Sequence, residues 1–451
     1  MKPIKQRTTF ILLLILLLSG GVILFCVRFI TQGSRWAAFS ANDHVYTDGH
    51  LAVGQILDRN GTLLYDPASD AYCDIASIRK ATLHAVGDRD NNIATSAKSA
   101  FRDQLVGFNP LTGTTSGGHK LHLTLDASLC ATAYNAMNGC KGTVGVYNYK
   151  TGAILCMVST PTFDPEDPPT IVDGDSRYDG VYLNRFLSST FTPGSIFKII
   201  TTAAALETIS DIENYSYTCT GQTTIDGQTI TCPSHHGTMD FYGIFANSCN
   251  CAYAELAAQL GGETLQQYVK AAHLLESQSV SGISTAAGSY EIGTKGEVGW
   301  SGVGQYKDLV NPCAMMTLMG SIASDGKIPL PRLILKETSL NGLTLFDTKQ
   351  PTAEAVWSPE TRQILRSMMA NNVAQTYGQS NFGDLAICAK SGTAEVGSGQ
   401  TPHAWFTGFL DDPEHPLAFI VLVENGGGGA RVAGSIASTV LQEAVANWKE
   451  D

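Results

Sequence analysis

The chain has 451 residues, a formal net charge of −12 and 43% hydrophobic residues. This length is enough for two or three structural units, at roughly 100–200 residues per domain. Acidic residues outnumber basic ones by 41 to 29, and no basic run is interleaved with aromatic residues, so nucleic-acid binding is excluded.

The first predicted element is an apolar helix near the N-terminus. Residues 8–27 carry no charge and are numerous enough to cross a bilayer as one helix. Lys2, Lys5 and Arg7 precede this run, so the positive-inside rule predicts a cytoplasmic tail over residues 1–7 and an extracytoplasmic remainder. A cleaved signal peptide is the alternative, but its apolar core is usually shorter, roughly 7–15 residues. The sequence therefore predicts a single-pass membrane protein.

A polar, turn-rich region over residues 28–120 follows the anchor. Within it, Asn60-Gly61 stands between two short apolar runs and predicts a β-hairpin. Residues 113–120 are rich in glycine and threonine and predict a linker. Nothing in this composition indicates chemistry, so the region is predicted to be a small membrane-proximal pedestal.

From residue 121 to residue 451 the pattern becomes that of a larger domain of the α/β (α+β) class. It starts with an alternating run, an alanine-rich helix and two strands. Further strands follow closely near the C-terminus, before a final helix, and predict an antiparallel sheet covered by helices. The predicted C-terminal strands lie at 387–396, 404–410 and 417–425, and the helix lies at 433–448.

The eleven cysteines contain no C-x-x-C pair, so the sequence predicts no metal site. Cys219 and Cys232 bracket a turn-rich segment that predicts a hairpin, and a disulfide between them is one possibility outside the cytoplasm. The other possibility is that most cysteines are small buried thiols, which suits their apolar neighbours and their odd number. The sequence leaves both open.

The first candidate catalytic motif is S-x-x-K, from Ser195 to Lys198. A Thr-Pro-Gly turn precedes it and an apolar, alanine-rich run follows, so Ser195 is predicted to open a buried helix. Residues three apart share a helix face, which brings the Lys198 amine within reach of the serine hydroxyl. Burial lowers a lysine pKa and lets the neutral amine accept the serine proton. Alone the motif is weak, because a capping serine near an exposed lysine gives the same pattern.

Two later motifs make the assignment specific. S-C-N begins at Ser248 and K-S-G-T begins at Lys390, in the order S-x-x-K, S-D-N, K-T-G of penicillin-interacting serine enzymes. Segments such as LNRFLSSTFTPGSIFKIITTAAALE and AKSGTAEVGSGQTPHAWFTGFL resemble class B penicillin-binding proteins, the monofunctional cell-wall transpeptidases. The resemblance covers about residues 121–445 and, more loosely, GQILDRNGTLLYD in the pedestal, where Val53 replaces an expected arginine. It implies the family's penicillin-binding transpeptidase fold with a dimerisation-like pedestal.

The resemblance also implies a role for each motif residue in peptidoglycan D,D-transpeptidation. Ser195 would attack the penultimate D-Ala carbonyl of a stem peptide and form an acyl-enzyme, with Lys198 as its base. Ser248 would relay a proton to the leaving amine, and Asn250 would hold the substrate amide. Lys390 would supply a positive charge. The implied substrate-binding residues of the last motif are Ser391, Gly392 and Thr393.

The K-S-G-T run is further predicted to be an edge strand that pairs with an extended peptide. Gly392 has no side chain and allows close approach. The backbone N–H groups of Ser195 and Thr393 are implied as the oxyanion hole. β-Lactams are implied as inhibitors, and no cofactor is expected.

Five other residues are assigned no catalytic role. Glu337 and Asn341 fit an E-x-x-L-N pattern that carries a deacylating glutamate in class A β-lactamases. Asn341-Gly342 stands between alternating apolar runs, however, which predicts an exposed hairpin turn. Because lysine already supplies the base, three histidines are predicted to serve polar packing: His235, His236 and His403.

The predicted function is peptidoglycan cross-linking, in which an acceptor amine resolves the acyl-enzyme. No glycosyltransferase-like module separates the anchor from the catalytic domain, so the family resemblance implies a polytopic membrane glycosyltransferase as partner. The alternatives are a D,D-carboxypeptidase or a serine β-lactamase, in which water resolves the same intermediate. A β-lactam sensor is a third possibility, although only about seven residues precede the predicted span.

Overall fold

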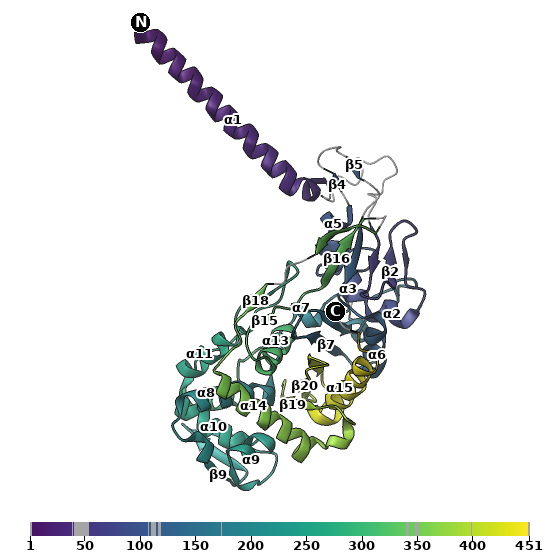
Figure 1. Ribbon diagram of the computed structural model, residues 1–451. Helices are drawn as coiled ribbons and strands as arrows, with labels where there is room; N and C mark the ends of the chain where they lie inside the picture. The colour runs from purple at the N-terminus through teal and green to yellow at the C-terminus, as the bar shows by residue number, and fades with distance from the viewer. Residues whose placement is uncertain are drawn as a thin grey trace.

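A long N-terminal helix projects from the body of the protein (Figure 1). This helix, α1, spans Lys2–Ala37, and its apolar part, Ile4–Gly33, is long enough to cross a membrane and has none of its most apolar window buried. It therefore fits a single membrane span. The computed structural model describes residues 2–37, 39, 54–106, 108–109, 114–115, 119–172, 174–339, 342–347, 351–397 and 399–449.

A five-stranded sheet forms the centre of the part of the chain that follows residue 120. Its five strands run antiparallel in the order β19-β20-β21-β7-β8, which confirms the predicted antiparallel sheet. β7, β8 and β21 are buried at every position, as expected for strands covered on both faces. The strands are β7 (Gly142–Asn148), β8 (Ile154–Thr160), β19 (Ile387–Ala394), β20 (His403–Leu410) and β21 (Leu417–Val423).

Helices cover both faces of this sheet (Figure 1). On one face α13 (Pro312–Ala323) packs so closely that a side chain at Gly320 would clash with the Tyr147 hydroxyl. On the other face α15 (Gly429–Ala446), the helix predicted near the C-terminus, packs on Phe406 and contacts α6 (Ala127–Met137). The sheet is thus the middle layer of three.

Polar N-caps fix where three of these helices begin. Asp126 accepts hydrogen bonds from two backbone N–H groups at the start of α6, and Asn311 accepts one at the start of α13. Ser358 caps α14 (Pro359–Asn372), with proline at its first position. Each cap stabilises its helix by about 1 kcal/mol.

A second, six-stranded sheet lies between α1 and the catalytic half (Figure 1). The predicted hairpin at Asn60-Gly61 is confirmed, because β1 and β2 pair across it. The predicted hairpin at 341–342 is also confirmed by the β16–β17 pair, although Asn341 itself lies outside the described residues. The strands, in sheet order, are β17 (Thr344–Asp347), β16 (Ile334–Thr338), β6 (Lys120–Leu123), β1 (Ile56–Leu57), β2 (Leu63–Asp66) and β3 (Ala71–Tyr72).

This second sheet runs across the predicted boundary at residue 120. Its strands β16 and β17 come from the sequence after that boundary. β16 pairs with β17 and with β6, and β6 in turn pairs with β1. The predicted linker over 113–120 lies partly outside the described residues, and within it Thr114–Thr115 pairs with Phe108–Asn109. Val53, where the family match departs, also lies outside them.

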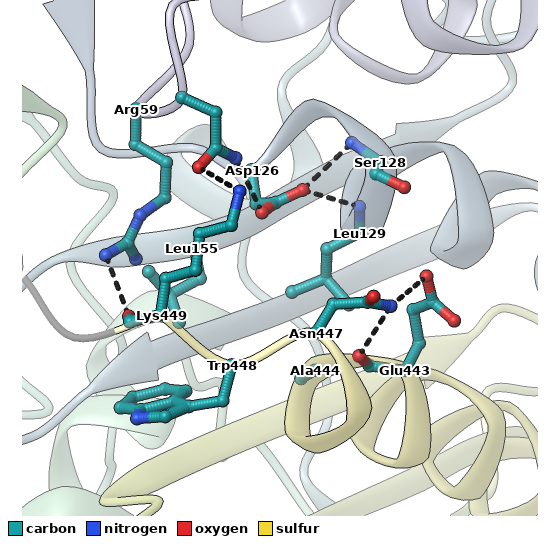
Figure 2. Close-up of a pocket in the computed structure, with 11 residues that line it drawn as sticks. Arg59, Asp126, Ser128, Leu129, Leu155, Glu443, Ala444, Asn447, Trp448 and Lys449 are labelled. Carbon is teal, nitrogen blue, oxygen red and sulfur yellow. Dashed lines mark hydrogen bonds between the residues drawn. The ribbon is translucent and has the colours of Figure 1, made fainter.

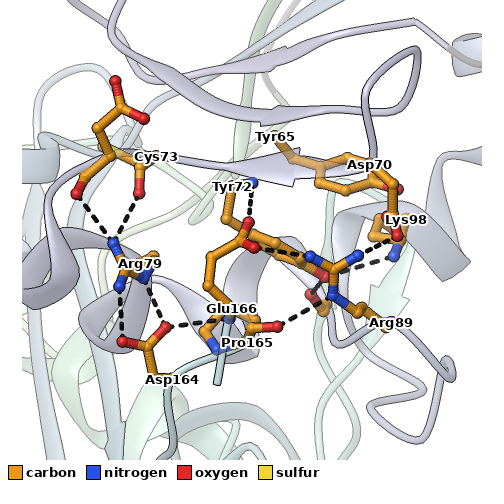
Figure 3. A network of polar contacts seen from close by, with 12 residues as sticks. Tyr65, Asp70, Tyr72, Cys73, Arg79, Arg89, Lys98, Asp164, Pro165 and Glu166 are labelled. Atoms are coloured by element: carbon orange, nitrogen blue, oxygen red, sulfur yellow. Dashed lines mark hydrogen bonds and ion pairs between the residues drawn. The ribbon is translucent and has the colours of Figure 1, made fainter. Parts of the chain in front are cut away.

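A polar network ties the pedestal to the loop after β8 (Figure 3). Arg79 makes a bidentate pair with Asp164, with Nε–Oδ1 and Nη2–Oδ2 distances of 2.5 and 2.8 Å. Glu166 accepts a hydrogen bond from the Tyr72 backbone N–H at 2.7 Å and pairs with Arg89 at 2.8 Å. Charge-assisted bidentate pairs fix geometry as well as contribute energy. The network therefore holds the pedestal in one orientation.

The tip of the pedestal hairpin makes a second junction, beside a pocket of about 350 Å³ (Figure 2). The Asn60 amide donates to Asp126 at 2.9 Å and accepts from the Lys449 amine at 3.0 Å. Arg59 donates to the Lys449 carbonyl at 3.3 Å. The hairpin, the start of α6 and the end of the chain therefore meet at one point.

Candidate active site

Ser195 lies on a tight turn that packs against the edge strand of the five-stranded sheet. A 3-10 turn over Gly194–Phe197 leads directly into α8 (Lys198–Thr208), which matches the predicted buried helix. Gly194 has a φ of +54°, and a Cβ there would lie 2.7 Å from the Thr393 carbonyl oxygen. Only glycine fits such a position without strain. The glycine therefore lets Ser195, which is half-buried, sit beside β19.

Lys198 is fully buried below Ser195. Its amine donates to the Ser248 carbonyl at 2.6 Å, to the Ser248 hydroxyl at 3.0 Å and to Asn250 Oδ1 at 2.8 Å. In the part of the chain that the structure describes, no hydrogen bond joins Lys198 to Ser195, and such contacts often tighten only when substrate binds. Burial lowers the pKa of Lys198 to about 7, so a neutral amine is available near neutral pH.

Ser248 joins the first and third motifs. It lies between α9 (Phe241–Ala246) and α10 (Asn250–Leu260) and has a φ of +51°, a left-handed conformation that costs a serine roughly 1–2 kcal/mol. The hydroxyl oxygen accepts from Lys198 and from Lys390, each at 3.0 Å. Strain of this kind persists only where surrounding contacts hold it.

Lys390 is the second fully buried amine of the site. Besides Ser248, it donates to the Ser391 carbonyl at 3.0 Å. Burial, and then the charge of nearby Lys198, hold its pKa well below the usual range of lysine. Two amines that share one hydroxyl oxygen resist being charged together, so this arrangement favours a single mobile proton.

The K-S-G-T motif forms part of β19, which is the edge strand of its sheet, as the sequence predicts. Sequence reasoning missed two aromatic side chains, one that holds this strand and one that holds the turn before Ser195. Tyr377 Oη accepts the Ser391 backbone N–H at 2.9 Å, and the Trp405 indole donates to the Thr192 carbonyl at 3.0 Å. Neither residue belongs to a motif, and only the fold shows their roles.

One cleft of about 380 Å³ joins the three motifs. Five predicted site residues line it, while the two lysines lie beneath and reach it through Ser248. Gly392 lies in β19 between two lining residues, and a Cβ there would lie 3.0 Å from Ile196 Cγ2. The lining residues are Ser195, Thr231, Cys232, Pro233, Asn247, Ser248, Asn250, Trp300, Val303, Gln305, Ser391, Thr393 and Glu395.

The residues that were assigned no catalytic role lie in other surroundings. Glu337 is in β16 of the second sheet, where it contacts His119, and it does not line the cleft. His403 Nδ1 accepts the Asn425 backbone N–H at 3.1 Å. His235 is exposed, while His236 is half-buried next to a group of thiols.

That group of thiols is a feature the sequence did not reveal. All cysteines in the described residues are free, and the predicted hairpin between Cys219 and Cys232 is present as β10 (Gln222–Ile225) and β11 (Gln228–Thr231). The sulfur atoms of Cys219, Cys232 and Cys249 and one ring nitrogen of His236 lie within 4.8 Å of one another. Their spacings of 13, 4 and 13 residues in the sequence form no compact motif.

Comparison with known proteins agrees with this geometry. The model of a family described as penicillin binding protein transpeptidase domain matches residues 142–442, two thirds of the chain. The peptidoglycan D,D-transpeptidase PbpA of Mycolicibacterium smegmatis is 28% identical over 429 residues, which cover 88% of this chain and 84% of that protein.

Solved structures share the fold. The ceftriaxone acyl-enzyme complex of penicillin-binding protein A from M. tuberculosis matches with a TM-score of 0.77 at 23% identity, over 87% of this chain and 98% of that one. A chain of a peptidoglycan synthase complex that coordinates polymerization and crosslinking matches with a TM-score of 0.63 at 22% identity, over 74% of this chain and 64% of that one.

Proposed function

Because the chain belongs to the penicillin-binding protein transpeptidase family, we propose that it is a peptidoglycan D,D-transpeptidase with Ser195 as its nucleophile. One observation carries the proposal. Two buried lysines from different motifs donate to the Ser248 hydroxyl, each at 3.0 Å. Ser248 lines the same cleft as Ser195. A buried amine with a lowered pKa is the group that a serine nucleophile needs as its base.

In the acylation step, the Ser195 oxygen attacks the carbonyl carbon of the penultimate D-Ala. Neutral Lys198 accepts the serine proton as the carbon–oxygen bond forms. The carbon–nitrogen bond to the terminal D-Ala then breaks, and its amine takes a proton through the Ser248 hydroxyl, which both lysines contact. The products are an acyl-enzyme and free D-Ala.

In the second step, the amine of another stem peptide attacks the acyl carbon. Its proton leaves through the same Ser248 contacts, the bond to Ser195 breaks, and the serine recovers its proton from Lys198. The new amide is the cross-link. Both steps use one proton that moves between two amines and one hydroxyl.

Substrate recognition rests on the free edge of β19. The extended peptide adds its backbone to this edge, and the Ser391 and Thr393 hydroxyls bind the terminal carboxylate. The backbone N–H groups of Ser195 and Thr393 polarise the carbonyl. Asn250 already bridges Lys198 and the Thr231 carbonyl, at 2.8 and 2.9 Å, so it orients the base as well as faces the substrate amide.

The organisation along the chain completes the proposal. Residues 1–7 form a cytoplasmic tail, 8–27 a membrane anchor, 28–120 the pedestal and 121–451 the catalytic domain outside the membrane. The apolar α1 supports the anchor, and β16 and β17 explain how the pedestal is held to the catalytic domain. The likeness to a chain of a peptidoglycan synthase complex supports a membrane glycosyltransferase partner, engaged through the anchor and pedestal.

The choice between an amine and water as acceptor decides between this function and a carboxypeptidase. The full-length chain in detergent is incubated with nascent glycan made by a purified glycosyltransferase, and muropeptides are counted by mass spectrometry. The proposal predicts cross-linked dimers that disappear in Ser195→Ala. Tetrapeptide monomers without dimers would show a hydrolase instead.

A further inference from the structure

The cluster of Cys219, Cys232, His236 and Cys249 next to the cleft has the geometry of a metal site. Its four candidate ligand atoms all lie within 4.8 Å of one another, and the Cys232 and Cys249 sulfurs are 3.6 Å apart. In a tetrahedral zinc site with Zn–S bonds of about 2.3 Å, two sulfurs are about 3.8 Å apart. A disulfide, by contrast, needs the two sulfurs at about 2.05 Å. The separation therefore matches two ligands of one metal ion.

Backbone pairing holds these four residues in place. β9 (Ser216–Cys219) pairs with β12 (Gly237–Asp240), which sets Cys219 opposite the residue after His236. Cys232 follows β11 directly, and its N–H donates to the Gly221 carbonyl at 2.8 Å. Cys249 is the N-cap of α10. Three separate segments thus supply ligands to one point, and each is anchored by hydrogen bonds.

A second observation comes from the histidine of the group. His236 Nδ1 is buried and has no hydrogen-bond partner among the described residues. A buried nitrogen left without a partner loses its hydrogen bonds to water without compensation, so such atoms are rare. A metal ion bound through this nitrogen would satisfy it.

Backbone N–H groups also surround the sulfurs. The N–H groups of Asn250 and Cys251 point at the Cys232 sulfur, at 3.1 and 3.4 Å, and the N–H of Ala252 points at the Cys249 sulfur at 3.5 Å. Donors around sulfur favour thiolates, which are the form that binds metal. Such outer contacts orient metal ligands.

We propose that Cys219, Cys232, His236 and Cys249 bind one Zn²⁺ beside the catalytic cleft. Three thiolates and one imidazole suit tetrahedral zinc better than the harder cations, which prefer oxygen. Four protein ligands leave no open position for water or substrate, so the ion is structural. Sequence spacing alone predicted no metal site here, because the ligands meet only after β9 and β12 pair.

The position of Cys249 gives this site a consequence for the second motif. Cys249 lies between Ser248, which holds a left-handed backbone, and Asn250, which contacts Lys198. Cys232 lines the cleft itself. Zinc bound to both cysteines would fix the segment that carries the strained Ser248, and these ligands would act as positioning residues.

Metal analysis of the full-length chain in detergent tests the proposal. After purification without chelators, inductively coupled plasma mass spectrometry should find close to one zinc ion per chain. Cys232→Ser and His236→Gln should each lose most of it. Cys251→Ser is the matched control, because this buried thiol lies two residues along α10 from Cys249 but outside the group, and it should keep its zinc. Co²⁺ exchanged into the wild-type chain should give the strong visible absorption of tetrahedral cobalt with thiolate ligands.

Three results would overturn the proposal. They are a wild-type chain that binds neither Zn²⁺ nor Co²⁺, a Cys232–Cys249 disulfide in the intact mass, and loss of zinc from Cys251→Ser. The cobalt spectrum uses the wild-type chain, so a variant that fails to fold does not weaken the test. Metal content does not depend on catalysis, so this test can fail while the transpeptidase proposal stands.

Discussion

The catalytic cleft beside the five-stranded sheet and the pedestal junction near the six-stranded sheet use charge in different ways. At the five-stranded sheet, the buried charged groups of the cleft, Lys198 and Lys390, carry lowered pKa values and meet at one hydroxyl. At the six-stranded sheet, Arg79 instead pairs with a carboxylate, and its side chain is 16% exposed. We propose that Lys198 and Lys390, which pair with no carboxylate among the described residues, serve proton transfer, whereas the Arg79–Asp164 pair serves docking of the pedestal. Burying the two lysines without a carboxylate costs folding free energy, and this cost falls at the cleft.

The largest effect is expected from removing the Lys198 amine, the proposed base. Lys198→Met should slow acylation by a β-lactam by about 10²–10⁴, the usual contribution of a general base. Lys98→Met is the matched control, because burial also lowers the pKa of half-buried Lys98, which belongs to the pedestal and lies over the Tyr65 ring. Stopped-flow acylation kinetics give both rates. Equal losses in the two variants would show that the position of the lysine does not matter.

The pH profile sharpens the same point with a smaller effect. Burial lowers the pKa of Lys198 to about 7, so below that pH the amine is protonated and cannot accept the serine proton. The acylation rate should rise about tenfold per pH unit up to that value and level off above it. Rates measured from pH 5 to 9 test this. A rate that falls as pH rises through 7 would require a protonated lysine in the step.

On the pedestal side, Arg79→Ala removes the bidentate pair with Asp164 (Figure 3). The expected loss is about 2 kcal/mol in the free energy of unfolding, because a largely buried carboxylate is left without its partner. The acylation rate of the folded protein should stay unchanged. Denaturant unfolding and acylation kinetics measure the two quantities, and Arg177→Ala, which breaks an exposed pair, should cost little.

The smallest expected effect is at the hairpin tip. Asn60→Ala removes the amide that contacts both Asp126 and Lys449 (Figure 2). Because these contacts are exposed, unfolding should become easier by only about 0.5–1 kcal/mol. Asn214→Ala removes a bond within a single turn and serves as the control. If both variants unfold alike, the hairpin tip does not help to hold the pedestal.

Local patterns made much of the fold predictable. The hairpin at Asn60-Gly61 and the strands β19, β20 and β21 follow from alternation and turn residues, which act over a few positions. The pairing of β16 with β6 joins residues more than 200 positions apart and leaves no local signal. For that reason the sheet shared between pedestal and catalytic domain could not be predicted.

The site shows the same limit. Ser195, Lys198 and Lys390 could be found from the order of three motifs, but the shared contact at Ser248 needs the fold that brings the motifs together. Tyr377 carries no motif, and its role depends on one hydrogen bond to the β19 backbone. The cluster of three cysteines and His236 forms only because β9 and β12 pair.

The most direct test of the central claim is acylation of Ser195. The full-length chain and its Ser195→Ala and Ser188→Ala variants are incubated with a fluorescent penicillin, and the label is followed over time. Label that is stable on the wild type and on Ser188→Ala but absent from Ser195→Ala is the predicted result. Label on Ser195→Ala would contradict the assignment of the nucleophile, and rapid release from the wild type would contradict the transpeptidase.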